Sequence, residues 1–209
     1  MSTPVTTWSL ELTSPDELRP AADAPAGAGV RIMRAEVPSA EFGRFLYTAV
    51  GADCAWRDRL PWPPERWRAH LELPGTEVWV AYERGTPAGY VELGAQDAGV
   101  VEILYFGLLP DFRGRGLGGR LLSFGTRRAW DLADRWEGRE PTKRVWVHTC
   151  SLDGPYALEN YRRRGFRVFD TVTEPAAGTA PGTAPGAASG SASETASGTA
   201  SGTAETSAT

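Results

Sequence analysis

The sequence predicts an α/β (α+β) fold in which a mixed β-sheet carries helices on both faces. Three observations support this prediction. Two alternating segments, 78–82 and 88–93, flank a Gly-containing turn at 83–86, which is typical of a β-hairpin. Two strand-to-helix units follow the hairpin. A glycine-rich turn at 113–119 separates the strand from the helix in the first of these units.

The first part of the chain supplies the elements before the hairpin. Residues 8–12 alternate in polarity and are a candidate for an added edge strand, and the Pro-, Ala- and Asp-rich residues 13–29 have the composition of a linker. The apolar run 30–35 predicts the first core strand. Large apolar side chains recur at helical spacing over 39–51 and 64–73, and Pro63-Pro64-Glu65 is a favourable helix start for the second of these.

The second part of the chain supplies the elements after the hairpin. Apolar runs predict its strands, and apolar residues at a spacing of three and four predict its helices. These elements are a strand at 100–109, a long helix from 117 to about 136, a strand at 143–149, a helix at 155–164 that ends at Gly165, and a strand at 166–172.

Composition divides the 209 residues into one folded domain with extensions. Residues 175–209 consist almost wholly of Ala, Gly, Ser, Thr and Pro, with Glu194 and Glu205 as the only charges, so they cannot bury enough apolar surface to offset the entropy of ordering. We therefore expect an N-terminal extension at 1–29, a folded domain at 30–174 and a disordered low-complexity tail at 175–209.

Charge and cysteine content exclude several classes of function. The net charge is −4, of which the tail supplies −2, so the folded part lacks the basic excess of a nucleic-acid-binding protein. No stretch predicts a signal peptide or a membrane span. His70 and His148 lack metal-ligand spacing, and Cys54 and Cys150 are expected to be free thiols. We expect a cytoplasmic enzyme without a metal, a membrane or a nucleic-acid partner.

The glycine-rich turn predicts a phosphate site. Unpaired N–H groups in the first turn of a helix and the positive end of its dipole attract phosphate, and glycine has no Cβ to block it. Gly114, Gly116 and Gly119 also satisfy the G-x-G-x-x-G pattern of dinucleotide-binding folds. However, residues 110–113 separate the strand from these glycines, and the next predicted strand ends without the carboxylate that the pattern needs. A dinucleotide-dependent enzyme is therefore the weaker alternative.

Two motifs resemble those of the GNAT N-acetyltransferase superfamily. Arg113-x-x-Gly116-x-Gly118, after a strand that ends in Leu108-Leu109-Pro110, is similar to its acetyl-CoA signature. Ala157-x-x-x-Tyr161-x-x-x-Gly165-Phe166 is similar to its late helix, where a tyrosine four residues before a Gly-Phe pair lies near the cofactor sulfur. The two motifs occur in the order found in the family.

The resemblance covers roughly residues 30–171 and implies a mostly antiparallel central sheet with helices on both faces. The chain departs from the family pattern in two places. The family usually has another strand after the position where this chain enters its tail, and the 8–12 segment is a candidate to fill that edge. Gly154 stands where many members carry an asparagine that binds the pantetheine arm, which leaves that contact in doubt.

The resemblance also implies a cofactor site for acetyl-CoA. In the manner of the family, the backbone N–H of Leu108 holds the thioester carbonyl, Phe106 and Gly107 line the path of the pantetheine arm, and residues 114–119 hold the pyrophosphate. The cofactor-binding residues implied are Phe106, Gly107, Leu108, Arg113, Gly114, Arg115, Gly116, Leu117, Gly118 and Gly119.

Acyl transfer from a thioester to an amine requires a base, an oxyanion donor and an acid. Glu102 lies six residues before Leu108, where some family members place a catalytic glutamate, and its apolar neighbours would strengthen a carboxylate as a base by desolvation. Tyr161 is the candidate acid for the CoA thiolate. Glu92 or a bound water is the alternative base, and His148 is interpreted as a packed residue.

These observations predict an N-acetyltransferase that moves an acetyl group from acetyl-CoA to a primary amine of a small molecule or peptide by direct attack in a ternary complex. A non-catalytic acyl-CoA-binding module that acts as a sensor or partner-binding domain is the alternative. Trp56, Trp62 and Trp67 lie where the family builds its acceptor pocket, but their positions suit a core equally well. A homodimer is implied by the resemblance alone.

Overall fold

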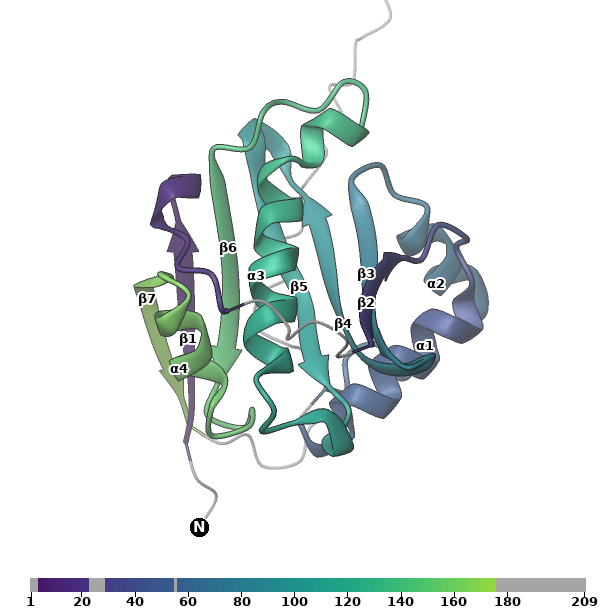
Figure 1. Cartoon of the computed structure of the whole chain (residues 1–209), viewed down its shortest axis with the longest axis horizontal. Coiled ribbons are helices and arrows are strands. Elements are labelled where there is room, and N and C mark those ends of the chain that lie inside the picture. The colour runs from purple at the N-terminus through teal and green to yellow at the C-terminus, as the bar shows by residue number, and fades with distance from the viewer. Residues whose placement is uncertain (1–3, 23–28, 55, 176–209) are drawn as a thin grey trace, which may run out of the picture.

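One seven-stranded sheet organises the protein, and helices cover both of its faces (Figure 1). The computed structural model describes residues 4–22, 29–54 and 56–175. The strands are β1 (Val5–Leu12), β2 (Val30–Arg34), β3 (Thr76–Glu83), β4 (Thr86–Ala95), β5 (Val100–Leu108), β6 (Arg144–Cys150) and β7 (Arg167–Glu174). The α-helices are α1 (Ala40–Val50), α2 (Pro64–Leu71), α3 (Leu117–Trp130) and α4 (Ala157–Arg163).

The sheet has the order β2-β3-β4-β5-β6-β1-β7, and every neighbouring pair except β5 and β6 is antiparallel. This mixed, mostly antiparallel sheet confirms the predicted fold class. The β3–β4 hairpin and the two β-α units also form as predicted. Since β6 returns parallel to β5, the connection between them must cross the sheet, and α3 supplies that crossover.

The first strand lies inside the sheet and not at its edge. β1 pairs with β6 on one side and with β7 on the other, so that β7 forms the edge. Leu10 and Leu12 of β1 are fully buried in the main core, which is the physical reason for this interior place. The candidate edge strand at 8–12 is therefore a longer strand, and the last strand of the chain adds outside it.

The two faces of the sheet carry different kinds of residue. Val101, Ile103, Val145 and Val147 point to the face covered by α3 and α4 and belong to the main core. The alternate positions of β4, β5 and β6 point to the other face, part of which α1 and α2 cover. The carboxylates and the histidine of the central strands lie on that second face.

The long helix after the glycine turn ends earlier than the sequence predicts. α3 stops at Trp130, and a 3-10 turn at Leu132–Arg135 follows. The Arg135 guanidinium folds back to donate to the carbonyls of Arg128 and Asp131 and forms a bidentate contact with the buried carboxylate of Glu77 at 2.8 and 2.9 Å. This contact fixes the chain beyond the helix against β3, so the helix cannot continue to residue 136.

The remaining predicted helices differ from the observed ones by at most two residues at either end. Short 3-10 turns in the described part of the chain lie at Pro15–Glu17, Gly51–Asp53, Asp97–Gly99 and Pro110–Phe112. None of the described helices has the length and apolar composition needed to cross a bilayer. The predicted tail at 175–209 lies, apart from Pro175, outside the described residues.

Candidate active site

An opening in the sheet between β5 and β6 defines the candidate site. The two strands pair in parallel only from Val100 and Arg144 to Ile103 and Val147, and then separate. On its other side, β5 has a bulge, because Ile103 faces Leu93 and Tyr105 faces Glu92, which leaves Leu104 without a partner on β4. Because the pairing with β6 ends at Ile103, the part of β5 after this residue presents an unpaired backbone edge to the opening.

Leu108, at the end of β5, lies where the sequence predicts an oxyanion donor. The N–H of Leu109 donates to the carbonyl of Ala88 on β4 at 2.9 Å. Since successive N–H groups of a strand point in opposite directions, the N–H of Leu108 points away from β4 and into the opening. Arg113 Nε donates to the Leu108 carbonyl at 2.9 Å and fixes this strand end against the glycine turn.

The glycine turn forms an open cradle at the start of α3. Gly114 and Gly116 have φ of +74° and +76°, a region that favours glycine, and a Cβ added at either position would meet no atom within 4 Å. Gly116 is the N-cap of α3 and no side chain caps the helix there, so its first N–H groups are available to a ligand. This geometry fits the pyrophosphate of acetyl-CoA.

The other predicted residues of the turn have packing roles in the structure. A Cβ at Gly118 would touch the Leu108 side chain at 3.6 Å, and one at Gly119 would meet the Arg164 guanidinium of the α4 end at 2.7 Å. Leu117 is buried in the main core and fixes the first turn of α3. These three residues therefore hold the helix start against β5 and α4.

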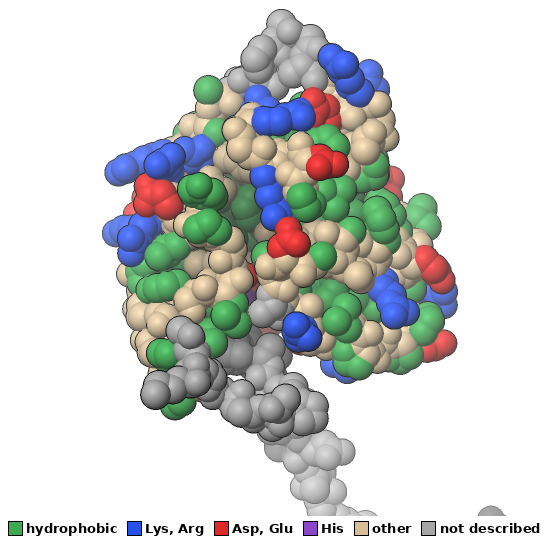
Figure 2. Space-filling view, turned by 90° about the horizontal axis from the view of Figure 1, so that it is seen from below, with side chains coloured by type: hydrophobic (Ala, Val, Ile, Leu, Met, Phe, Trp, Pro, Cys, Tyr) green, Lys and Arg blue, Asp and Glu red, His purple; other side chains and the backbone are tan. Residues whose placement is uncertain are grey.

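The arginines of the turn use their guanidinium groups within the protein. Arg113 pairs with Asp53 at 2.8 Å, and Arg115 pairs with Glu83. Figure 2 views this end of the molecule, where Lys and Arg side chains gather beside acidic ones. Arg162 and Arg163 of α4 are also exposed, and the next residue, Arg164, reaches the start of α3 at Gly119. The backbone N–H of Arg113 donates to the Pro110 carbonyl at 3.1 Å, so Arg113 would contact a phosphate only after exchange of its carboxylate partner, whereas Arg115 would contact it through its backbone N–H or after the same exchange.

Replacing Gly116 with Ala is expected to weaken acetyl-CoA binding on the order of tenfold, about 1.4 kcal/mol. The added Cβ projects into the cradle, and the left-handed backbone becomes strained by roughly 1–2 kcal/mol. Gly138→Ala is the matched control, because Gly138 also has a positive φ of +78° and open space around it. Calorimetric titration with acetyl-CoA should separate the two variants; equal affinities would contradict the assignment of the cradle.

Tyr161 lies on α4 at the core side of the opening. Its ring packs edge-on against Phe106 of β5 at 6.0 Å and against Phe166 at 5.9 Å. Burial raises the pKa of the Tyr161 hydroxyl well above its ordinary value, and the charge of Asp153 adds to this effect. The hydroxyl is therefore protonated at neutral pH, as a proton donor must be.

Glu102 lies on the opposite face of the sheet, beside the last paired residues of β5 and β6. Its side chain is 6% exposed, and its carboxylate contacts Gln96 and His148. Glu102 and Tyr161 thus approach the opening from its two faces. The contact with His148 was not expected from the sequence, which favoured a packing role for this histidine.

Glu92, the alternative base, is committed to a buried ion cluster. Arg59 Nη1 donates to both of its oxygens at 2.8 and 3.0 Å, and His70 Nε2 lies 2.6 Å from Oε1. Burial alone would raise the pKa of Glu92, but the charge of Arg59 and the contacts with His70 and Arg59 outweigh it and lower the pKa to about 2. Glu92 is therefore a poor base, and Glu102 remains the stronger candidate of the two carboxylates.

The tryptophans before β3 differ in burial. Trp67 is buried against Tyr47 and has a core role. Trp56 is half-buried and packs edge-on against Tyr105 of β5 at 4.8 Å, on the α1 and α2 face of the sheet. Asp58 next to it accepts hydrogen bonds from the hydroxyls of Tyr47 at 2.7 Å and Tyr105 at 2.6 Å. The α1–α2 connection thus lies over β5 on the same face as Glu102.

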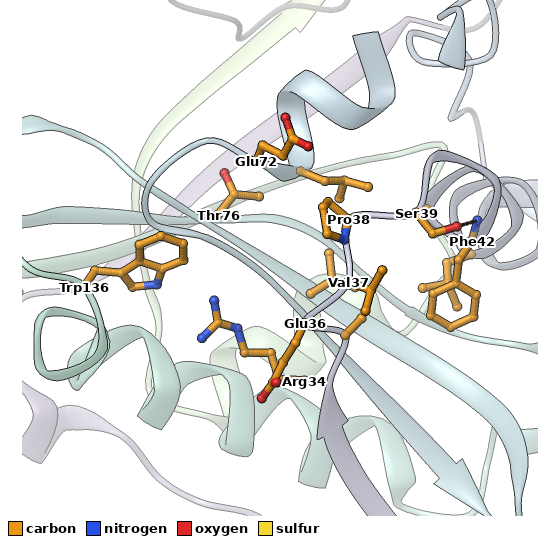
Figure 3. A pocket seen from close by; sticks show the side chains of 14 residues that line it. Arg34, Glu36, Val37, Pro38, Ser39, Phe42, Glu72, Thr76 and Trp136 are labelled. Carbon is orange, nitrogen blue, oxygen red and sulfur yellow. Dashed lines mark hydrogen bonds between the residues drawn. The ribbon is translucent and has the colours of Figure 1, made fainter. Parts of the chain in front are cut away.

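A separate cavity of about 180 Å³ lies at the other end of the sheet. It is lined by the end of β2, the start of α1, the end of α2 and Trp136, and Figure 3 shows Arg34 and Trp136 on one side of it. β3 starts there, whereas β5, which runs in the same direction, ends at the glycine turn. The cavity therefore contains none of the predicted site residues.

The described residues contain no group of three or more His, Cys, Asp or Glu side chains arranged to hold a metal ion. Cys54 and Cys150 are free thiols, and burial raises the pKa of both.

The fold and the sequence comparisons together define the family of this protein. The sequence profile of the acetyltransferase (GNAT) family matches residues 47–166, and the chain belongs to this family. The resemblance stated from the two motifs is therefore confirmed.

Several relatives have a longer chain than this protein. The mycothiol acetyltransferase of Mycolicibacterium smegmatis is 30% identical over 128 residues, which cover 56% of this chain and 41% of that protein. A GCN5-related N-acetyltransferase from Kribbella flavida has a TM-score of 0.55 at 22% identity, covering 82% of this chain and 59% of its own. A GCN5-related N-acetyltransferase from Sphaerobacter thermophilus has a TM-score of 0.56 at 21% identity, covering 82% of this chain and 51% of its own. The chain thus spans less than two thirds of each of these relatives.

Proposed function

We propose that this protein transfers an acetyl group from acetyl-CoA to a primary amine of a small molecule or peptide, by direct attack in a ternary complex. One observation carries the proposal: the opening between β5 and β6 has the N–H of Leu108 on its edge, Glu102 on one face and Tyr161 on the other. The mycobacterial relative is a mycothiol acetyltransferase, which supports acetyl as the transferred group.

Each reacting group has a residue that suits it. Removal of the ammonium proton depends on Glu102, after which the free amine attacks the thioester carbonyl and forms the C–N bond. The N–H of Leu108 stabilises the negative charge that develops on the carbonyl oxygen. The C–S bond then breaks, its electron pair goes to sulfur, and the Tyr161 hydroxyl protonates the thiolate. The second proton, which the newly bonded nitrogen loses as the amide forms, returns to the Tyr161 oxygen through water and restores the hydroxyl.

Ligand stabilisation of the full chain tests the cofactor directly. A ligand that binds only the native state stabilises it by RT ln(1 + [L]/Kd), roughly 2.7 kcal/mol at a hundredfold excess over Kd. We expect acetyl-CoA and CoA to raise the melting temperature, and NADH, NADPH and ATP to leave it unchanged at the same concentrations.

An amine screen that measures free CoA thiol then tests turnover. Thiol release that requires both acetyl-CoA and an amine supports the enzyme. Stabilisation by acetyl-CoA without transfer to any amine would favour the acyl-CoA-binding module, and stabilisation by a nucleotide instead would overturn the assignment of the glycine turn.

A further inference from the structure

His148 occupies a distinctive place at the candidate site. It is the first residue of β6 beyond the last parallel pair, Ile103 and Val147, so it lies at the point where the opening begins. Its Nδ1 is buried and lies 3.4 Å from Oε1 of Glu102. The side chain as a whole is 38% exposed, so the accessible edge of the ring is the one that carries Nε2.

Glu102 is held in the orientation that this contact needs. Gln96 Nε2 donates to Glu102 Oε2 at 2.8 Å, and Trp146 Nε1 donates to Gln96 Oε1 at 3.2 Å, which fixes the orientation of the amide. One carboxylate oxygen is therefore occupied, and the other faces the imidazole. With only 6% of its side chain exposed, Glu102 offers little surface to an acceptor molecule.

We infer that His148 Nε2 is the atom that takes the proton from the acceptor ammonium, and that Glu102 acts through His148 as the carboxylate that orients and charges the ring. This inference rests on the proposed acetyl transfer and assigns its proton-transfer step. The arrangement follows the general logic in which a buried carboxylate holds an imidazole for proton transfer. At 3.4 Å the contact is longer than an aligned hydrogen bond, and such contacts often tighten when substrate binds.

The proton balance of the step is simple. Neutral His148 keeps its proton on Nδ1, toward Glu102 Oε1, and the lone pair on Nε2 accepts one proton from the ammonium. The free amine attacks the thioester, and the resulting imidazolium is stabilised by Glu102. Its Nε2 proton then passes to water through the exposed edge of the ring, which restores the neutral form.

Three carboxylates from three parts of the chain influence the charge of the imidazole. The contact with Glu102 on β5 raises the pKa of His148 above its ordinary value, burial opposes this shift, and the charges of Asp153 after β6 and Asp58 in the α1–α2 connection add to it. A base with a raised pKa accepts a proton more readily from an ammonium group. The neutral form of His148, which accepts the proton, predominates only above this pKa. The rate of acetyl transfer should therefore rise as the pH increases through the pKa of His148.

The first test compares the full-length protein with His148→Gln, Glu102→Gln and the double variant. Thiol release is measured against pH with phenethylamine, 1,4-diaminobutane and glycinamide as acceptors. We expect His148→Gln to lower kcat by at least a hundredfold and to remove the inflection, and Glu102→Gln to move the inflection to lower pH. The double variant should be no slower than the slower single one, since the two residues act as one unit.

Ser9→Ala is the matched control, because Ser9 of β1 lies directly opposite His148 in the sheet. It should keep the wild-type pH profile, and thermal unfolding should show all variants folded. An unchanged pH profile in His148→Gln, or losses of kcat that add in the double variant, would overturn the role of His148 and leave the proposed acetyl transfer standing. If the wild-type protein acetylates none of the three amines, the proposed function itself fails on these acceptors, and with it the reaction step assigned to His148.

A second test needs no acceptor. The chain contains only two histidines, so NMR titration of the imidazole signals can be assigned with His148→Gln alone. We expect His148 to titrate above the ordinary histidine range near 6.5, and to return toward it in Glu102→Gln. An unshifted pKa in the wild-type protein would mean that Glu102 does not charge the ring.

Discussion

The double variant Glu102→Gln, Tyr161→Phe is expected to lose acetyl transfer while it still binds acetyl-CoA. General acid and base groups contribute typically 10²–10⁴-fold each. Glu102→Gln removes the negative charge on which proton removal depends, and we expect it to lower kcat by a factor in that range. Tyr161→Phe removes the donor for the thiolate, and we expect a loss of about 10–100-fold because a thiolate is a good leaving group.

The measurement pairs kcat with the acetyl-CoA dissociation constant for each variant. Neither side chain belongs to the cradle formed by Gly114 and Gly116, so the dissociation constant should remain within about threefold of the wild-type value. Tyr156→Phe is the matched control for Tyr161, since Tyr156 is 82% exposed just before α4. Full activity of the double variant would refute the assigned roles.

Glu92→Gln is expected to destabilise the fold by about 3–5 kcal/mol, because removing one partner of a buried ion pair leaves the other charge uncompensated. Arg59 would then remain buried among Trp62 and Tyr105, over whose rings its guanidinium lies at 4.8 and 4.3 Å, without a carboxylate. Urea unfolding measures the loss. Glu41→Gln on the exposed side of α1 is the control and should change stability by less than about 0.5 kcal/mol.

The same carboxylate predicts an acid-sensitive fold. The pKa of Glu92 is lowered from 4.5 to about 2 in the folded state, so its contribution is fully present above about 4.5 and is lost as pH falls toward 2. Unfolding curves at pH 7, 4 and 2.5 should show a smaller loss for Glu92→Gln than for the wild-type protein. An equal pH dependence of the two, or a destabilisation below 1 kcal/mol at pH 7, would contradict the ion cluster.

Most of the fold can be predicted from the sequence because its strands, turns and helices depend on patterns that span only a few residues. The alternation in β3 and β4 and the glycines before α3 gave the hairpin, the crossover and the family correctly. The end of α3 was placed about six residues too late, since it depends on the contact of Arg135 with Glu77, 58 residues away in the sequence.

The candidate site likewise has one part that local sequence patterns predict and one part that depends on distant contacts. The glycine cradle and the edge of β5 follow from short motifs, whereas the partners of its charged groups do not. The approach of His148 to Glu102 depends on the register between β5 and β6. The burial of Glu92 depends on Arg59, which lies in the irregular connection between α1 and α2. One usable signal was present: Glu102 and His148 lie on strands that the predicted β-α unit makes parallel neighbours.

The interior place of β1 has a consequence for the order in which the protein can assemble. Ser9 pairs with His148, 139 residues later, and with Asp170 on the other side. During synthesis the first strand leaves the ribosome long before either partner exists, so it must wait unpaired until nearly the whole domain has been made. Such distant pairings are slow to form. The strand that carries His148 therefore gains its second neighbour only when β1 docks beside it, and β1 in turn gains its own second neighbour only when β7 has been made.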